Sequence, residues 1–221
     1  MLTVKSNSYE YSVIRNIVYL LFNYLVKIDV NDIIFAQENS TTNFDQILNE
    51  CFKLRHDTFI ERLSWDIPSV NGLERDYFDD LSPTHIVIKN DKTINGYWRA
   101  LPCEGDYMLQ SIFPELLQGE DAPKNKNTWE ISRFAVRKGS SQSQSGYISN
   151  ISLDLIQSFY QFALSKQITS YVTVTTVACE RLLRQVGLKI RRLGEGKVLK
   201  IGVERTVALH IDMSNSALMA K

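Results

Sequence analysis

Hydrophobic and polar positions recur along this chain with two different periods, and these periods separate predicted helices from predicted strands. Apolar residues spaced by three or four predict a helix over residues 44–63, with Thr42-Asn43 offering an N-cap. The clearest helical pattern covers residues 147–166. A further helix is predicted over residues 177–186, where Gly187 ends it.

Shorter segments of alternating or β-branched residues predict strands. Two of these strands flank the turn Asp91-Lys92 and form a predicted hairpin. A short helix is predicted over residues 111–117. The predicted strands cover residues 33–37, 85–89, 94–101, 128–136, 170–176, 188–192 and 197–211. Because strands and helices alternate without a repeat or a linker, the pattern predicts one α/β domain, a three-layer α-β-α sandwich around a mixed, twisted sheet.

The two ends of the chain fall outside this pattern. The predicted domain covers residues 31–212, and residues 213–221 are expected to form a loose tail. Residues 1–30 are expected to be an extension, either an amphipathic extra helix or untranslated sequence upstream of the true start. Their apolar run, from Ile17 to Val26, is too short to span a bilayer, so no stable membrane insertion is expected.

Composition narrows the class of protein. The 221 residues include 25 Lys and Arg against 25 Asp and Glu, so the charge does not favour nucleic acid. The three cysteines form no CxxC pair and the three histidines are scattered, which argues against disulfides and against a metal site. Reduced thiols of this kind are typical of a cytoplasmic protein.

One stretch, from Arg55 to Asp79, mixes basic, aromatic and acidic residues in a way that suits a pocket better than a core. Such a pocket would hold a zwitterionic aromatic ligand. The residues of this stretch that we single out are Arg55, Phe59, Trp65, Glu74, Asp76 and Asp79. The other wall of the pocket is predicted to consist of Arg99, Phe113, Glu130 and Arg133.

The order and spacing of these residues form a recognisable pattern. It is Arg55-x3-Phe59-x5-Trp65, Glu74-x-Asp76-x2-Asp79, Arg99, Phe113 and Glu130-x-Ser132-Arg133. Over residues 33–211 the chain resembles the acyl-homoserine-lactone synthases, the LuxI-type autoinducer synthases that make quorum-sensing signals in Gram-negative bacteria. The first 30 residues depart from the pattern of that family.

The resemblance implies an N-acetyltransferase-like fold and two substrates, S-adenosylmethionine and an acyl group carried as a thioester on acyl carrier protein. It implies that the substrate amine attacks the thioester to form an amide. The substrate carboxylate then closes the lactone and expels methylthioadenosine. This second step mainly needs orientation, because the sulfonium is already a good leaving group. S-adenosylmethionine is thus a substrate, and no cofactor is expected.

The acidic candidates are assigned by what the chemistry requires. Asp76 and Asp79 are expected to hold the substrate ammonium and sulfonium through charge-assisted hydrogen bonds, the alternative being a solvated acidic loop. Glu130 is the candidate general base, acting through a water, since its place on an apolar strand should raise its pKa. The alternative for Glu130 is a structural ion pair with Arg133.

The basic and aromatic candidates complete the predicted S-adenosylmethionine site. Arg55 is expected to pair with the substrate carboxylate or with the acidic loop. Phe59 and Trp65 offer stacking surface for adenine or the sulfonium, with plain core packing as the alternative. Arg99 and Arg133 are charges on predicted strands and therefore need partners, and Arg133 is expected near the acyl carbonyl.

A second group of residues is expected to bind the acyl chain. Phe113 is predicted to line its channel, and Ser132 is predicted to face a hydrogen-bond partner there rather than to act as a nucleophile. A threonine in this region of the family favours 3-oxo-acyl substrates, but Thr173, Thr175 and Thr176 all qualify. Their β-branched side chains also suit a plain strand.

A basic cluster is predicted to bind the acidic carrier protein, with a solvated basic surface as the alternative reading. Its members are Arg181, Arg184, Lys189, Arg191 and Arg192.

Two other classes of protein compete with this interpretation. An acetyl-coenzyme A-dependent N-acetyltransferase would bind pyrophosphate with a glycine-rich turn, but the second glycine is missing from Arg137-Lys138-Gly139-Ser140-Ser141. A non-catalytic S-adenosylmethionine-binding module would keep Asp76, Asp79 and Trp65 but would not need Glu130.

Overall fold

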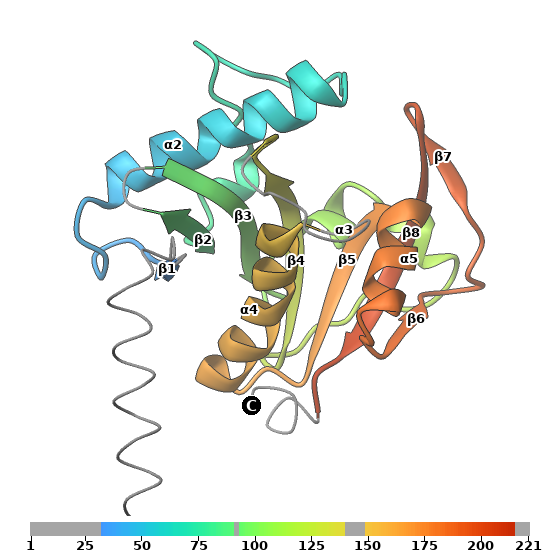
Figure 1. Ribbon diagram of the computed structural model, residues 1–221. Coiled ribbons are helices and arrows are strands. Elements are labelled where there is room, and N and C mark those ends of the chain that lie inside the picture. The colour runs from blue at the N-terminus through green and yellow to red at the C-terminus, as the bar shows by residue number, and fades with distance from the viewer. Residues whose placement is uncertain (1–31, 91–92, 140–148, 215–221) are drawn as a thin grey trace, which may run out of the picture. The chain divides into compact units, whose positions relative to one another are not determined.

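The predicted strands form one mixed, eight-stranded sheet in the order β1-β2-β3-β4-β5-β8-β6, with β7 paired to β8 (Figure 1). The computed structural model describes residues 32–90, 93–139 and 149–214, all within the compact unit Asp32–Lys221. Strands β4 and β5 are parallel, whereas their neighbours pair antiparallel. The strands are β1 (Asp32–Ala36), β2 (Thr84–Asn90), β3 (Thr93–Pro102), β4 (Thr128–Val136), β5 (Ser170–Thr176), β6 (Ile190–Arg192), β7 (Leu199–Ile201) and β8 (Glu204–Asp212).

Helices cover both faces of this sheet, which confirms the predicted α/β sandwich. The α-helices are α2 (Phe44–His56), α3 (Met108–Ser111), α4 (Asn150–Lys166) and α5 (Val177–Gln185). Alternation along β2 and β3 directs Ile86 and Trp98 toward α4, and their neighbours Val87 and Tyr97 toward α2. Helix α3 packs on the same face as α2, against Val172 of β5.

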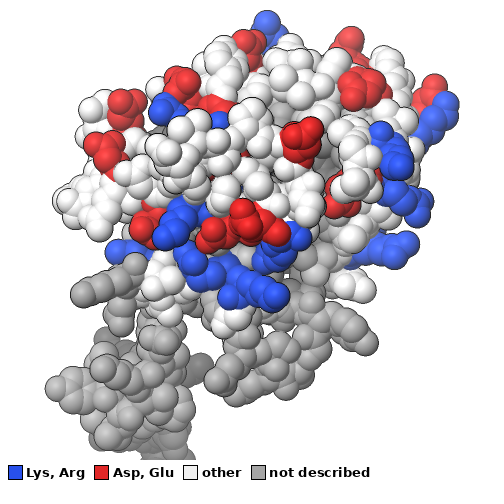
Figure 2. Space-filling model, turned by 90° about the horizontal axis from the view of Figure 1, so that it is seen from above, with Lys and Arg blue, Asp and Glu red and all other residues white. Residues whose placement is uncertain are grey.

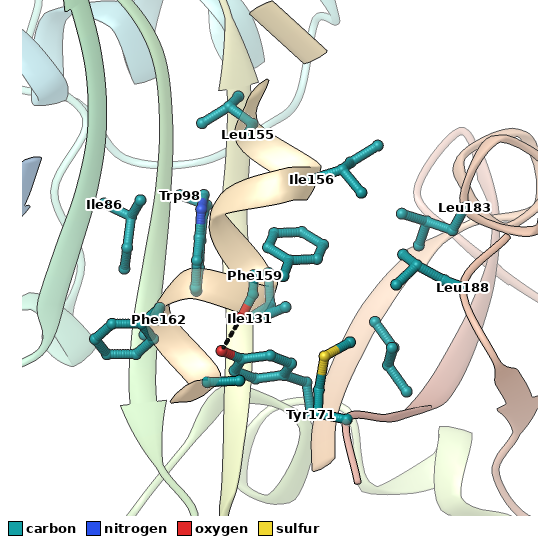
Figure 3. Packing of buried hydrophobic residues seen from close by; sticks show 14 of the residues in the cluster. Ile86, Trp98, Ile131, Leu155, Ile156, Phe159, Phe162, Tyr171, Leu183 and Leu188 are labelled. Carbon is teal, nitrogen blue, oxygen red and sulfur yellow. Dashed lines mark hydrogen bonds between the residues drawn. The ribbon is translucent and has the colours of Figure 1, made fainter. Parts of the chain in front are cut away.

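The main core lies between α4 and the sheet (Figure 3). Trp98 is fully buried, with the rings of Phe159 and Phe162 edge-on to it at 4.9 and 5.7 Å between centroids. The Tyr171 hydroxyl donates a hydrogen bond of 2.9 Å to the carbonyl of Phe159. These contacts attach β5 and β3 to the same helix and so fix the middle of the sheet.

Three sequence-based boundaries were wrong. The helix predicted over residues 44–63 changes at Asp57 into a π-helix, η1 (Asp57–Arg62). At its start, Asn43 precedes α2 with φ 59°, and its side chain makes no capping hydrogen bond. The predicted helix 111–117 is divided between α3 and the 3₁₀ turn η3 (Pro114–Leu117). The predicted strand 197–211 is two strands, because Gly202 adopts φ 57° and reverses the chain.

Several predictions concern segments outside the described residues. They are the extension at 1–30, the turn at Asp91-Lys92, most of the loop and helix start over 140–148, and the end of the tail at 215–221. Within the ranges that the structure describes, no helix is long and apolar enough to cross a membrane.

Gly194 offers a test of how closely η3 approaches the β6–β7 connection. Its φ is 59°, and a Cβ there would overlap the carbonyl oxygen of Leu117. Gly194→Ala is expected to lower the free energy of unfolding by about 3 kcal/mol, through left-handed strain together with overpacking. Denaturant titration measures the change.

Gly187→Ala is the matched control, because Gly187 also has positive φ, 85°, but no atom within 4 Å of its Cβ position. Strain alone should cost it about 1 kcal/mol. Equal losses in the two variants would contradict the close approach.

Candidate active site

Strands β4 and β5 separate soon after they meet. They pair only from Thr128↔Ser170 to Glu130↔Val172, so the remaining residues of each strand diverge toward their C-terminal ends. Strand β4 also bulges along its other edge, where it pairs with β3. Tyr97 pairs with Ala135 and Arg99 with Ser132, so two steps along β3 face three steps along β4. The opening and the bulge place irregular backbone at the same end of the sheet, where β-sheet proteins often form sites.

Arg133 is the extra residue of this bulge. Its φ is 57°, which is costly for a residue with a long side chain. The bulge allows Arg133 to join the face on which Ser132 already lies, instead of alternating away from it. From there its guanidinium bonds Glu74 at 3.1 Å and Asp76 at 2.7 Å.

Asp79 lies between two buried arginines. Its carboxylate accepts hydrogen bonds from Arg55 Nη1 at 2.8 and 2.9 Å and from Arg99 Nη1 at 2.8 Å. Both arginine side chains are 0% exposed and that of Asp79 is 1% exposed. Burial alone would raise the pKa of Asp79, but the charges of Arg99 and Arg55 outweigh burial and hold this pKa well below its usual range.

Asp76 is the carboxylate of this network that reaches solvent. Its side chain is 20% exposed and bonds Arg99 as well as Arg133. Asp76 also accepts a hydrogen bond of 2.9 Å from the Phe78 amide, while its own amide donates to Asp79, a capping box at the start of the 3₁₀ turn η2 (Tyr77–Asp79). The capping box fixes the two carboxylates relative to each other.

Glu74 completes the network and was not assigned a role from the sequence. It is 1% exposed and bonds both Arg55 and Arg133. The only signal in the sequence was its place in the Glu74-x-Asp76-x2-Asp79 spacing. The network therefore contains three arginines and three carboxylates and has no net charge: Arg55, Arg99, Arg133, Glu74, Asp76 and Asp79.

Two aromatic side chains lie beside the network: Phe59, in the π-helix η1, and Trp65, which follows that helix. The ring of Phe59 stacks on that of Trp65 at 4.8 Å with 17° between planes, and the Arg133 guanidinium lies 5.8 Å above the Phe59 ring. Phe59 is 3% exposed within a core cluster. Two buried donors, Trp65 Nε1 and Arg55 Nη2, make no hydrogen bond with any residue that the structure describes, although Arg55 Nη2 lies 3.6 Å from Asp76 Oδ2. Such donors are rare in folded proteins and mark places where a ligand can bind.

Glu130 is held by backbone rather than by an ion pair. Its two carboxylate oxygens accept hydrogen bonds from the amides of Met108 at 2.9 Å and Leu109 at 2.7 Å. Arg133 bonds other carboxylates, so the alternative pair of Glu130 with Arg133 is not formed. Burial raises the pKa of Glu130 to about 7, although the amides and the nearby arginines oppose the rise.

Residues predicted to bind the acyl chain lie on both faces of the sheet. Phe113 packs with α3 and η3 residues on one face. Ser132 does face a hydrogen-bond partner, since its hydroxyl accepts a bond of 3.1 Å from Arg99 Nε. Strand alternation places Thr173 and Thr175 on the opposite face, across from Leu209 and Val207 of the α4 core, while Thr176 caps helix α5. The three threonines are therefore not equivalent.

Most of the predicted basic cluster is already paired. The ion pairs are Arg184 and Arg192 with Glu180, Lys189 with Asp212, and Arg191 with Glu120. Arg181 is exposed and makes no ion pair with any residue that the structure describes. Pairing reduces the charge that this cluster presents to an acidic partner.

Solved structures share this architecture. The acyl-homoserine-lactone synthase LasI is 36% identical, with a TM-score of 0.74 over 84% of this chain and 91% of LasI. TofI, solved in a complex with an inhibitor and MTA, is 26% identical, with a TM-score of 0.69 over 86% of this chain and 95% of TofI. A putative N-acetyltransferase from Lactobacillus plantarum has the same fold at a TM-score of 0.55 and 14% identity, over 83% of this chain and 99% of its own. The N-acetyltransferase-like fold is thus confirmed.

Sequence comparison narrows this class to one family. Residues 38–220 match the sequence model of the autoinducer synthases. The acyl-homoserine-lactone synthase of Aliivibrio fischeri is 40% identical over 163 residues, 73% of this chain and 84% of that protein. That of Pseudomonas aeruginosa is 39% identical over 181 residues, 80% of this chain and 88% of that protein. The chain therefore belongs to the autoinducer synthase family and is an acyltransferase.

The buried position of Asp79 leads to a stability prediction. Asp79→Asn leaves Arg55 and Arg99 buried with one carboxylate fewer, and should cost about 3–5 kcal/mol of unfolding free energy. Because the folded-state pKa of Asp79 is depressed, its contribution is present above its ordinary pKa of about 3.9 and is lost as pH falls toward the lower folded value. Denaturant titrations from pH 7 to pH 3 should therefore show a constant gap between wild type and variant down to about pH 4, and a gap that begins to narrow below it.

Asp80→Asn is the control for this measurement. Asp80 is 57% exposed and pairs with Arg75 at the surface, so its loss should cost under about 1 kcal/mol. If Asp79→Asn were no more harmful than Asp80→Asn, the network would not be needed for stability.

Proposed function

We propose that this chain synthesises an N-acyl homoserine lactone from S-adenosylmethionine and an acyl thioester of acyl carrier protein. The observation that carries the proposal is the charge-balanced network beside the opening between β4 and β5, with two buried donors left for a ligand. The MTA of the TofI complex agrees with methylthioadenosine as the second product. The reaction takes place in the cytoplasm, where both substrates are made.

S-adenosylmethionine binds where the network meets the aromatic pair. Asp76, the carboxylate that reaches solvent, takes the substrate ammonium, while Asp79 acts from behind by holding Arg55 and Arg99 in place. The Nη2 of Arg55, which is 3.6 Å from Asp76 Oδ2 and makes no hydrogen bond within the described residues, donates to the substrate carboxylate. Trp65 offers its ring to the adenine or the sulfonium and its Nε1 to an acceptor on the substrate.

Amide formation begins when the bound ammonium loses a proton. Glu130 accepts it through a water, because each of its oxygens keeps a lone pair beyond its amide hydrogen bond. A pKa of about 7 suits this role near neutral pH. The free amine attacks the thioester carbonyl, and Arg133 stabilises the developing oxyanion. As the carbon–sulfur bond breaks, the nitrogen gives its second proton to the departing thiolate, and Glu130 releases the first proton to solvent.

Lactone closure follows within the same substrate. The carboxylate oxygen bonds to the carbon next to sulfur, the carbon–sulfur bond breaks, and its electron pair neutralises the sulfonium. No proton is transferred in this step. The network contributes by holding the carboxylate and the sulfonium carbon in line, since orientation is the main barrier to an intramolecular displacement.

The acyl chain enters between the diverging strands. Phe113 lines one face of this entrance, and Thr173 lies on β5 immediately after the last pair with β4. Of the three threonines, Thr173 is thus the one placed to hydrogen-bond a 3-oxo group. A carrier-protein donor is favoured over coenzyme A because the sequence lacks the second glycine of a pyrophosphate-binding turn.

Glu130→Gln tests the general base. The glutamine keeps the size of the side chain and one acceptor for the α3 amides, but it cannot take a proton. We expect turnover to fall by about 100-fold or more, with S-adenosylmethionine affinity by calorimetry changed less than about threefold. The wild-type rate should rise with pH through about 7, and the residual rate of the variant should lack this rise.

The pH profile separates catalysis from anchoring. If Glu130 only anchored α3, the variant would lose activity, but its residual rate would still rise with pH through about 7. Near-normal turnover would remove Glu130 from both roles.

The reaction itself is tested with a panel of donors. Purified protein is incubated with S-adenosylmethionine and acyl carrier protein thioesters from C4 to C14, with and without a 3-oxo group. Mass spectrometry should detect one N-acyl homoserine lactone series together with equimolar methylthioadenosine. If no donor gives lactone although S-adenosylmethionine binds, the chain is a binding module. If only acetyl-coenzyme A is consumed, it is an N-acetyltransferase.

A further inference from the structure

The hairpin of β7 and β8 carries positive charge that the structure does not neutralise. Lys200 lies directly opposite Arg205 in the ladder, and both side chains are exposed. Neither makes an ion pair with any residue that the structure describes, whereas the neighbouring Lys197 pairs with Glu195. Like charges directly opposite each other destabilise a pair of strands. The hairpin therefore maintains an electrostatic cost that its own fold does not explain.

The position of the hairpin connects it with the active site. Thr176, the last residue of β5, pairs with Thr206, so the hairpin before Thr206 extends beyond the end of β5. This is the end toward which β4 and β5 diverge. In Figure 1 the hairpin rises on the right of the molecule, past the tops of β5 and α5. It thus stands next to the entrance for the acyl chain.

The tip of the hairpin exposes an apolar side chain. Val203 is 73% exposed, the largest exposed fraction among the large hydrophobic residues that the structure describes. Gly202 precedes it with φ 57°, so the turn projects Val203 away from the sheet. A single exposed apolar side chain is ordinary by itself, but Val203 lies between Lys200 and Arg205 in the chain and adds apolar area to the same hairpin.

Basic side chains are also visible when the molecule is viewed from the end at which the hairpin lies (Figure 2). Figure 2 shows basic side chains along its right edge, the side on which β7, β8 and α5 lie in Figure 1. Lys189, at the far end of the sheet, is by contrast neutralised by Asp212.

We propose that Lys200, Arg205 and Val203, the hairpin patch, dock the acidic surface of acyl carrier protein and direct its thioester arm to the opening between β4 and β5. The inference rests on the proposed function, since it takes the donor to be a carrier-protein thioester. It moves the main contact from the paired α5–β6 cluster to the hairpin. Positive side chains at the rim of an interface chiefly accelerate association with an acidic partner, so the effect depends on salt.

The test compares two double charge reversals of equal size. Lys200→Glu/Arg205→Glu changes the hairpin patch, and Lys126→Glu/Lys166→Glu changes two exposed lysines that precede the starts of β4 and β5, at the opposite end of the sheet. The hairpin variant should raise KM for acyl carrier protein thioesters about tenfold, with kcat and KM for S-adenosylmethionine unchanged. The control variant should leave all three constants within about twofold of wild type.

Two further measurements separate docking from damage. An acyl-pantetheine thioester of the same chain length lacks the carrier protein, so the hairpin variant should use it as well as wild type does. Val203→Ser should raise KM for the carrier-protein donor by about threefold without changing its dependence on salt, because no charge is altered.

Direct binding keeps the inference independent of turnover. Fluorescently labelled holo-acyl carrier protein should bind wild type more tightly than the hairpin variant, and the difference should shrink from 50 to 500 mM salt. Equal binding, an equal effect of the control variant, or an equal loss with acyl-pantetheine would each overturn the hairpin proposal. Absence of lactone from wild type with every donor would instead overturn the proposed function, and the binding result would still stand.

Discussion

The structure depends on a network of six charged side chains buried against one face of the sheet. Removing a guanidinium from water is costly unless its hydrogen bonds and its charge are both matched, and here three arginines meet three carboxylates. The six residues come from α2, the acidic loop, β3 and β4. Their pairing therefore fixes these elements relative to one another, which apolar packing alone does less specifically.

Irregular backbone surrounds this network. Helix α2 continues as a π-helix that carries Phe59, β4 bulges at Arg133, and β4 and β5 stop pairing after Glu130. Each irregularity costs free energy or hydrogen bonds in isolation. Together they direct an aromatic ring, a guanidinium and a carboxylate to one end of the sheet. The chemistry of an acyltransferase needs these groups together, and regular elements would have directed them apart.

Charge is used differently inside and outside the protein. In the interior, three arginines and three carboxylates balance, so the buried network carries no net charge. At the surface, most basic residues near α5 and β6 are also balanced, but Lys200 and Arg205 of the outer hairpin are not, as far as the described residues go. Under the proposed function, positioning of one substrate and recruitment of the other would rest on separate charges.

The sequence by itself determined the alternating α/β pattern and most of the helices and strands, because hydrophobic period is a local property. It also required that Arg99 and Arg133 find partners. Only the tertiary structure decided which carboxylate each arginine meets, that Glu74 joins them, and that Glu130 is bound by the Met108 and Leu109 amides. These contacts join residues 19 or more positions apart, and neither helical nor strand periodicity carries information over such separations.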